Sequence, residues 1–155
     1  MGERERKLEA AGYPLERGPK EGPVIDLLAI VGETLYASGQ VPNDAGVLTS
    51  KGKVPSQVSV EDATKAAALC AANVLRAIWL KLGSLDRIER VVRVTGYVNA
   101  DPDFADCHLV VNGATNLLKE VFGPEAGRHA RTALGMGQLP LGCSVEVEAI
   151  FQLKK

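Results

Sequence analysis

The chain has 155 residues, of which 46% are hydrophobic and 24% are charged, and its formal net charge is −1. This length suits a single domain with its own hydrophobic core. The near-zero net charge argues against a dedicated nucleic-acid-binding protein, because such proteins usually carry a clear basic excess. The charged start, MGERERKLEAAG, lacks the apolar run of a signal peptide, and no long apolar stretch follows. We therefore expect a cytoplasmic protein with no membrane partner.

The three cysteines, Cys70, Cys107 and Cys143, lie far apart, form no CxxC motif and are accompanied by only two histidines. This pattern argues against a zinc site and against a disulfide framework. We interpret the cysteines as buried, reduced thiols. The scattered glycines match neither a phosphate-binding loop nor a dinucleotide-binding motif. We therefore expect no metal and no organic cofactor.

The N-terminal part of the chain mixes one short helix with a turn-rich loop. Residues 3–11 predict the helix, which ends near Gly12, and the loop continues to about residue 22. We treat residues 1–22 as an N-terminal extension and residues 23–155 as one domain. The segment IDLLAIVGETLYASGQ then predicts two strands joined at Gly32-Glu33, that is, a β-hairpin. A long connection rich in turn residues follows it.

Two helices are predicted from their apolar periodicity and their termini. The first begins at an N-cap, Ser59, with Asp62 three residues later, and ends at Gly83. Its polar residues Asn73 and Arg76 lie off the apolar stripe. The second helix is predicted from about residue 102 to residue 122. Its stripe comprises Phe104, Cys107, Val111, Ala114 and Leu118.

Three further strands complete the prediction. In RIERVVRVTGYVNA, alternation places Val92, Val94 and Val98 on one face. Residues 130–137 and 143–152 predict the last two strands. The order β-β-α-β-α-β-β predicts a two-layer α+β domain, with hairpins at both ends and two helices on one face of the sheet.

The other face of the sheet is predicted to be half polar, with Arg93, Thr95 and Tyr97 on one strand and Glu146 and Glu148 on the last. An open sheet face of this kind usually needs a partner, so we expect a homo-oligomer. Glu146 and Glu148 point the same way, roughly 7 Å apart at their Cα atoms. They could form an acid/base pair, although periodicity alone favours a solvated face.

Arg131 heads a strand that is nearly empty on one face, because Ala133, Gly135 and Gly137 alternate with it. Glycine in a strand often marks the close approach of a ligand or another backbone. The planar guanidinium can bind a carboxylate through two hydrogen bonds. An ion pair with a glutamate at a subunit contact is an equal alternative, and both remain open. His129, in a loop, is interpreted as structural or solvated.

Several separated blocks resemble one known family. They are YASGQVP (Tyr36–Pro42), VVNGATNLLKEVFG (Val110–Gly123), RTA at Arg131 and LPLGCSVEVEAIF (Leu139–Phe151). These blocks are similar to the Rid family, also called YjgF, many members of which are labelled endoribonuclease L-PSP. The similarity covers the chain from about residue 23 and is greatest to a slightly longer subgroup with a chorismate-mutase-like fold.

The resemblance implies a homotrimer with clefts between its subunits and a mixed β-sheet. It also implies hydrolysis of reactive enamines and imines, such as 2-aminoacrylate, to keto acids and ammonia without a cofactor. The family's carboxylate-binding arginine corresponds to Arg131, and its water-binding glutamate to Glu146. The serine and glycine of the first strand correspond to Ser38 and Gly39, and the asparagine near the cleft to Asn112.

Two positions depart from the pattern of the deaminase members. Val24 follows Gly-Pro where these members often have tyrosine, and Ala133 replaces a cysteine in the substrate-binding position two residues after the arginine. Three functions therefore compete: an enamine/imine deaminase, a non-enzymatic trimer that binds a small carboxylated metabolite, and the ribonuclease of the family label. The last ranks lowest because the two histidines are far apart and the net charge is −1. A chorismate mutase activity rests on fold analogy alone.

Overall fold

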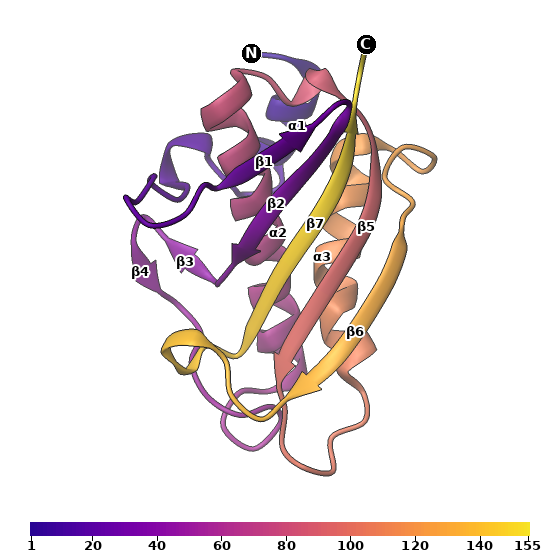
Figure 1. Cartoon of the computed structure of the whole chain (residues 1–155). Helices are drawn as coiled ribbons and strands as arrows, with labels where there is room; N and C mark the ends of the chain where they lie inside the picture. Colours follow the sequence, from indigo (N-terminus) through magenta and orange to yellow (C-terminus); the bar gives the residue numbers. More distant parts are fainter.

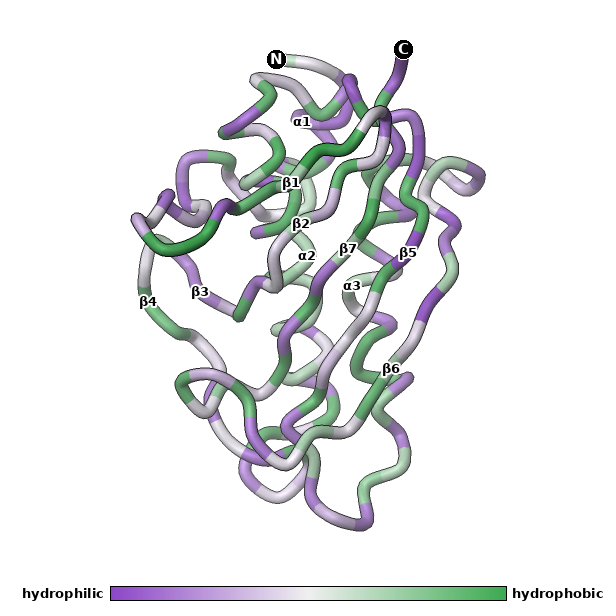
Figure 2. Tube along the Cα trace, in the orientation of Figure 1, coloured by the Kyte–Doolittle hydropathy of each residue, from purple (hydrophilic) through white to green (hydrophobic).

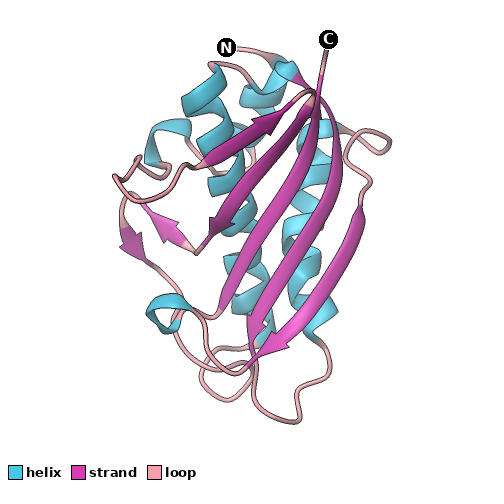
Figure 3. Ribbon diagram, viewed as in Figure 1, coloured by secondary structure: helices cyan, strands magenta, loops and turns pink.

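A computed structural model describes all residues 1–155 and shows two layers, a five-stranded sheet and a layer of helices behind it (Figure 1). The strand order is β1-β2-β7-β5-β6, and a separate two-stranded ribbon, β3-β4, lies beside the sheet (Figure 3). The strands are β1 (Leu28–Val31), β2 (Thr34–Gln40), β3 (Asn43–Asp44), β4 (Val47–Leu48), β5 (Ile88–Asn99), β6 (Ala130–Met136) and β7 (Val145–Leu153). The helices are α1 (Glu3–Ala10), α2 (Val60–Leu82) and α3 (Cys107–Phe122). The predicted two-layer α+β fold is confirmed.

The topology at the C-terminal end differs from the predicted hairpin. β6 pairs with β5 in parallel, as the strands on either side of a helical crossover do, and therefore lies at the sheet edge beside α3. β7 does not pair with β6 but runs antiparallel to both β2 and β5 in the centre of the sheet. The five-stranded sheet is mixed, as predicted, but within it only the N-terminal β1-β2 pair is a hairpin.

The first long helix, α2, has the predicted termini. The Ser59 hydroxyl accepts a hydrogen bond of 3.0 Å from the backbone N–H of Asp62, and Gly83 ends the helix with a φ of 76°. α3 begins at Cys107, five residues after the predicted start. Asp101, near the start of the segment after β5, contacts the loop before α2: its carboxylate accepts hydrogen bonds from the backbone N–H and the hydroxyl of Ser56.

The core lies between the sheet and the two long helices. Along β7, buried residues alternate with more exposed ones, and the hydropathy of the chain alternates along this strand (Figure 2). In β5, Val94 and Val98 are buried as predicted, but Val92 is 41% exposed. The prediction for Val92 was wrong because the register with β7 shifts between Val91 and Arg93, and this irregularity breaks the simple alternation. Beyond it, Thr95 and Tyr97 alternate with the buried valines and lie on the uncovered face.

The two long helices touch closely. A Cβ added to Gly113 of α3 would collide with the backbone carbonyl of Thr64 in α2, so glycine permits this approach. By length and composition α2 could cross a membrane, but 67% of its most apolar window is buried inside the domain. That burial is typical of the core helix of a soluble domain.

A buried polar network joins the N-terminal extension to α2, which corrects the placement of Asn73 and Arg76. Both lie off the apolar stripe, yet they are only 2% and 1% exposed. Arg76 Nε donates to the Pro14 carbonyl at 2.9 Å and its Nη1 donates to Asn73 Oδ1 at 2.9 Å. Their burial is tolerated because these polar atoms have partners. Leu8 and Leu15 of the extension belong to the hydrophobic core.

Candidate functional site

Arg131 lies on the helix side of edge strand β6. Its register partner in β5 is Val94, which is buried beneath the helices, and neighbouring residues in a parallel pair point to the same face. Arg131 Nη1 donates to Asn112 Oδ1 at 2.9 Å and to Thr115 Oγ1 at 3.0 Å. Nη2 lies 3.5 Å from the carbonyl oxygen of His108. No carboxylate forms an ion pair with this half-buried arginine, so it is an oriented cation without a counter-ion within the chain.

The acceptors for Arg131 come from one side of α3. His108, Asn112 and Thr115 occupy positions i, i+4 and i+7, which share a helix face. Asn112, predicted only by family resemblance, therefore contacts Arg131 directly. Thr115 was missed by the sequence analysis. Its spacing of three residues from Asn112 was a usable signal, because residues i and i+3 share a helix face.

His129 extends this group of side chains. Its Nε2 lies 3.1 Å from Thr115 Oγ1, and its Nδ1 lies 2.7 Å from the carbonyl oxygen of Gly127. Burial lowers the pKa of His129, and the positive charge of Arg131 lowers it further, whereas the hydrogen bond to Gly127 opposes both. We call Asn112, Thr115, His129 and Arg131 the arginine cluster.

The small residues after Arg131 have a packing role. Ala133 contacts the edge of the hydrophobic core. A Cβ added to Gly135 would lie 3.2 Å from Ala100 Cβ and 3.4 Å from Cys107 Sγ, so the start of α3 leaves little room for a side chain at this position of β6. Val24, at the second departure from the family pattern, lies in the loop before β1 and is 87% exposed.

Glu146 lies on the uncovered face of β7 and is half-buried, yet it forms no hydrogen bond or ion pair within the chain. Burial raises its pKa above the usual value, and the negative charge of Glu148 raises it further. Glu148 differs, because its carboxylate accepts a hydrogen bond of 3.0 Å from the Tyr97 hydroxyl. The two glutamates are therefore neither a solvated face nor a symmetric pair.

The end of β2 borders Glu146. A Cβ added to Gly39 would collide with Glu146 Oε1, so glycine leaves the room that this carboxylate occupies. The neighbouring Ser38 donates its hydroxyl to the Asp26 carbonyl at 2.7 Å and its backbone N–H to the Leu27 carbonyl at 2.9 Å. Both residues lie where the β2-β7 register shifts. We call Ser38, Gly39 and Glu146 the glutamate cluster.

The two clusters do not meet within one chain. Arg131 faces the helices from edge strand β6, whereas Glu146 lies on the opposite face of the sheet in β7. Strand β5 runs between these two strands (Figure 1). The structure thus brings Arg131 together with Asn112, and Glu146 together with Gly39. It separates these two predicted halves of the site.

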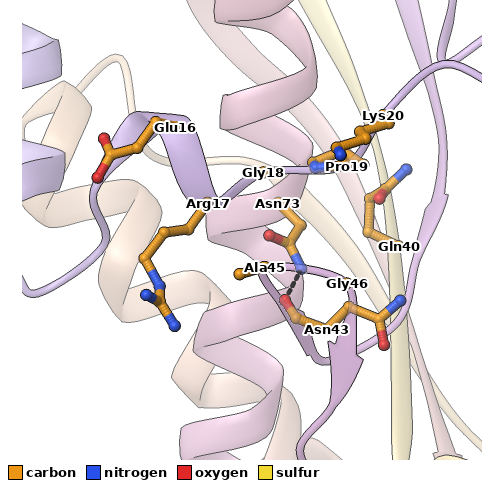
Figure 4. Close-up of a pocket in the computed structure, with 10 residues that line it drawn as sticks. All are labelled: Glu16, Arg17, Gly18, Pro19, Lys20, Gln40, Asn43, Ala45, Gly46 and Asn73. Atoms are coloured by element: carbon orange, nitrogen blue, oxygen red, sulfur yellow. Dashed lines mark hydrogen bonds between the residues drawn. The ribbon is translucent and has the colours of Figure 1, made fainter.

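A polar cavity of about 470 Å³ lies elsewhere, between the N-terminal extension, α2 and the β3-β4 ribbon (Figure 4). Its lining comprises Glu16, Arg17, Gly18, Pro19, Lys20, Gln40, Asn43, Ala45, Gly46 and Asn73. Asn73 Nδ2 donates to the backbone carbonyls of Val41 and Asn43 beside this cavity.

All three cysteines are free and buried, and no group of three or more His, Cys, Asp or Glu side chains could hold a metal ion.

A mixed sheet of this order, with two long helices packed on one face, defines an α+β domain of the chorismate-mutase-like class. The family model described as "YjgF/chorismate_mutase-like, putative endoribonuclease" matches residues 5–152. The chain belongs to this family, as its motifs predicted.

Three relatives illustrate the similarity. Protein TCP17 of Trypanosoma cruzi is 43% identical over 123 residues, which are 79% of this chain and 76% of that protein. The crystal structure of protein Atu1372 from Agrobacterium tumefaciens is 40% identical, with a TM-score of 0.88 over 97% of this chain and 92% of its own. A structure titled "putative endoribonuclease" from Shewanella oneidensis MR-1 is 30% identical, with a TM-score of 0.91 over 98% and 100%. The latter two share almost the whole fold.

Proposed function

We propose that this protein hydrolyses small reactive enamines and imines, of the 2-aminoacrylate kind, to keto acids and ammonia without a cofactor. The observation that carries the proposal is the oriented Arg131 guanidinium, which has no counter-ion within the chain. Membership of the YjgF family supports it, because the family resemblance implies that this arginine binds the carboxylate group of the substrate.

The hydrogen bonds of Arg131 leave it donors for a ligand. A guanidinium has five N–H groups. Nη1 uses two of them on Asn112 and Thr115, and Nη2 directs one toward the His108 carbonyl. Nε–H and the second Nη2–H remain, which is the number that a bidentate carboxylate requires. A keto acid or an imino acid would supply that carboxylate.

The separation of the clusters favours a cleft between two copies of the chain. Glu146 cannot reach a substrate held by Arg131 of its own chain, because the two residues lie on opposite faces of the sheet. A neighbouring copy can present its own Glu146 to this Arg131. The half-polar uncovered face, with exposed Tyr36 and Val92, supplies the contact surface. We propose a homotrimer assembled through this face, in agreement with the family resemblance.

The reaction needs little beyond positioning and one proton acceptor. An enamine first takes a proton on carbon to become an iminium, which is the electrophile. Glu146 accepts a proton from a water molecule as the water oxygen bonds to the iminium carbon, which forms a carbinolamine. The same carboxyl group then returns the proton to nitrogen. Ammonia leaves as the C–N bond breaks, and the Glu146 carboxylate takes the hydroxyl proton as the C=O bond of the keto acid forms. Glu146 then releases this proton to solvent, which balances the proton that the enamine took up. Burial and the negative charge of Glu148 raise the pKa of Glu146, which makes it a stronger proton acceptor than an ordinary glutamate.

The test combines ammonia release with ligand binding. The protein is mixed with a dehydratase that generates 2-aminoacrylate, and ammonia release is compared with the uncatalysed rate. Titration calorimetry with pyruvate and 2-oxobutanoate measures binding, and sedimentation measures assembly. We expect faster ammonia release, keto acid binding and a trimer. Unchanged ammonia release with no keto acid binding would sink the proposal.

A non-enzymatic binding trimer is the second candidate. The specific observation in its favour is that Val24 and Ala133 replace the tyrosine and cysteine of the deaminase pattern, whereas the arginine is retained. Keto acid binding without accelerated ammonia release would identify it. The ribonuclease of the family description ranks lower, because His129 is engaged with Thr115 and Gly127 and the net charge is −1.

A further inference from the structure

We infer that His129 is a positioning residue for Arg131 and acts through the hydroxyl group of Thr115. The expected effect on carboxylate binding rests on the proposed function, whereas the positioning of Arg131 does not. The geometry itself is a chain of three contacts. It runs from the Gly127 carbonyl to His129, from His129 to Thr115, and from Thr115 to Arg131.

The direction of each hydrogen bond follows from the chemistry at the two ends. The Gly127 carbonyl can only accept, so His129 Nδ1, at 2.7 Å, must carry a proton. In the neutral imidazole Nε2 is then an acceptor, and the Thr115 hydroxyl donates to it over 3.1 Å. The Thr115 oxygen keeps its lone pairs for Arg131 Nη1, at 3.0 Å. The neutral Nδ1–H tautomer of His129 thus turns Thr115 into an acceptor aimed at the arginine.

The relay determines how the guanidinium is oriented. Without Thr115, the guanidinium would keep one short hydrogen bond, to Asn112, and the long contact of 3.5 Å with the His108 carbonyl, which restrain its plane less. Thr115 supplies a second acceptor for the same Nη1 nitrogen, and two fixed acceptors set the plane. The remaining Nε–H and Nη2–H donors then point in a defined direction. An arginine oriented in advance loses less freedom when it binds a carboxylate.

Protonation of His129 would oppose this arrangement. An imidazolium has no acceptor nitrogen, so the Thr115 hydroxyl would lose the acceptor for its proton and would have to turn that proton elsewhere. Burial disfavours the charged form of the ring and lowers the pKa of His129, and the positive charges of Arg131 and Lys119 lower it further, against the opposing effect of the hydrogen bond to Gly127. The neutral form that the relay requires is therefore the form that its surroundings favour.

The primary experiment uses the ligand-free, full-length protein. Nitrogen-15 NMR of the histidine rings identifies the tautomer of His129, and the Arg131 side-chain signals report rotation of the guanidinium. We expect the Nδ1–H tautomer and slow rotation in the wild type. His129→Phe should speed up the rotation, whereas Glu120→Phe, which introduces the same ring at an exposed position of α3, should not. An Nε2–H tautomer, or unchanged rotation in His129→Phe, would overturn the inference.

A double-mutant cycle tests the route through Thr115. Affinity for 2-oxobutanoate is measured by calorimetry in His129→Phe, Thr115→Val and the double variant. Loss of one hydrogen bond in the relay should weaken binding about 2- to 10-fold. Once Thr115 is valine, the change at His129 should have no further effect. His129→Gln should recover part of the affinity, because its amide oxygen can accept from Thr115. A full effect of His129→Phe in the Thr115→Val background contradicts the relay.

The two proposals fail differently. If the wild type binds no keto acid but His129→Phe still frees the Arg131 side chain, the proposed function fails and the positioning role stands. If keto acids bind equally well to the wild type and to a folded His129→Phe variant, the positioning role fails and the proposed function stands. Thermal unfolding and sedimentation of each variant separate these outcomes from a loss of structure.

Discussion

The arginine cluster and the glutamate cluster place their charged groups in opposite settings. Arg131 has two side-chain acceptors on Nη1, and one of them, Thr115, also contacts His129. Glu146 has no partner within the chain, and burial and Glu148 raise its pKa. A charge held by several hydrogen bonds is suited to fixing a ligand. A carboxylate that is half-buried and unpaired is suited to accepting a proton.

This difference explains how one small domain could separate binding from proton transfer. The two clusters lie on opposite faces of the sheet. The arginine cluster lies between β6 and α3, and the glutamate cluster lies on the uncovered face at β7. A change in one should therefore leave the other intact within the chain. The following predictions test that separation, under the proposed function.

Glu146→Gln should have the largest effect. The amide keeps the shape of the side chain but cannot accept a proton from water, so turnover should fall roughly 100- to 10,000-fold. Keto acid affinity should stay close to that of the wild type. Ammonia release and calorimetry measure the two quantities. Glu148→Gln is the matched control. Because Glu148 accepts a hydrogen bond from Tyr97, we expect turnover to fall far less in this variant. Equal losses in both variants would contradict a special role for Glu146.

Arg131→Lys should abolish most of the binding even though it keeps the positive charge. Lysine lacks the planar pair of donors, so the loss of a charge-assisted bidentate contact should weaken keto acid affinity by about 30- to 1,000-fold. Calorimetry on the folded variant measures it. If Arg131→Ala binds keto acids as well as the wild type does, the arginine is structural and the site assignment is wrong.

Gly39→Ala should reduce turnover without reducing binding at Arg131. The new methyl group would displace the Glu146 carboxylate, and a displacement of about 1 Å can cost roughly 100-fold in rate. The control is Gly137→Ala, since a Cβ at Gly137 meets no atom within 4 Å. Steady-state ammonia release, compared between the two alanine variants, is the measurement. Similar rates in both would show that the position of Glu146 is not critical.

The pH dependence of turnover should show an acid limb that belongs to Glu146. The carboxylate works as a base only when it is deprotonated, so kcat/KM should fall as the pH drops below its pKa. Since that pKa is raised, the fall should begin at a higher pH than for an ordinary glutamate. Glu148→Gln removes one cause of the raised pKa and should move the limb to lower pH. A limb that stays in place would mean that another group controls it.

Local signals account for the parts of the fold that were predicted correctly. Ser59 and Gly83 mark the ends of α2, because a cap and a left-handed glycine act within a few residues. The Gly32-Glu33 turn likewise joins β1 to β2. The start of α3 was predicted about five residues too early, in a segment that follows the contact between Asp101 and Ser56, which are distant in sequence. Burial of Arg76 was missed because its partners include Pro14, which is also distant in sequence.

The sequence by itself determined the fold class, the family and the chemical types of the site residues. Its motifs identified Arg131, Asn112, Gly39 and Glu146 as candidates. Only the tertiary structure decided which of them meet. Alternation along a strand tells which residues share a face, but the face itself depends on the strand's neighbours and on the crossover that orders them. Parallel pairing with β5 turns Arg131 toward α3, Thr115 and His129, whereas central β7 holds Glu146 on the opposite face.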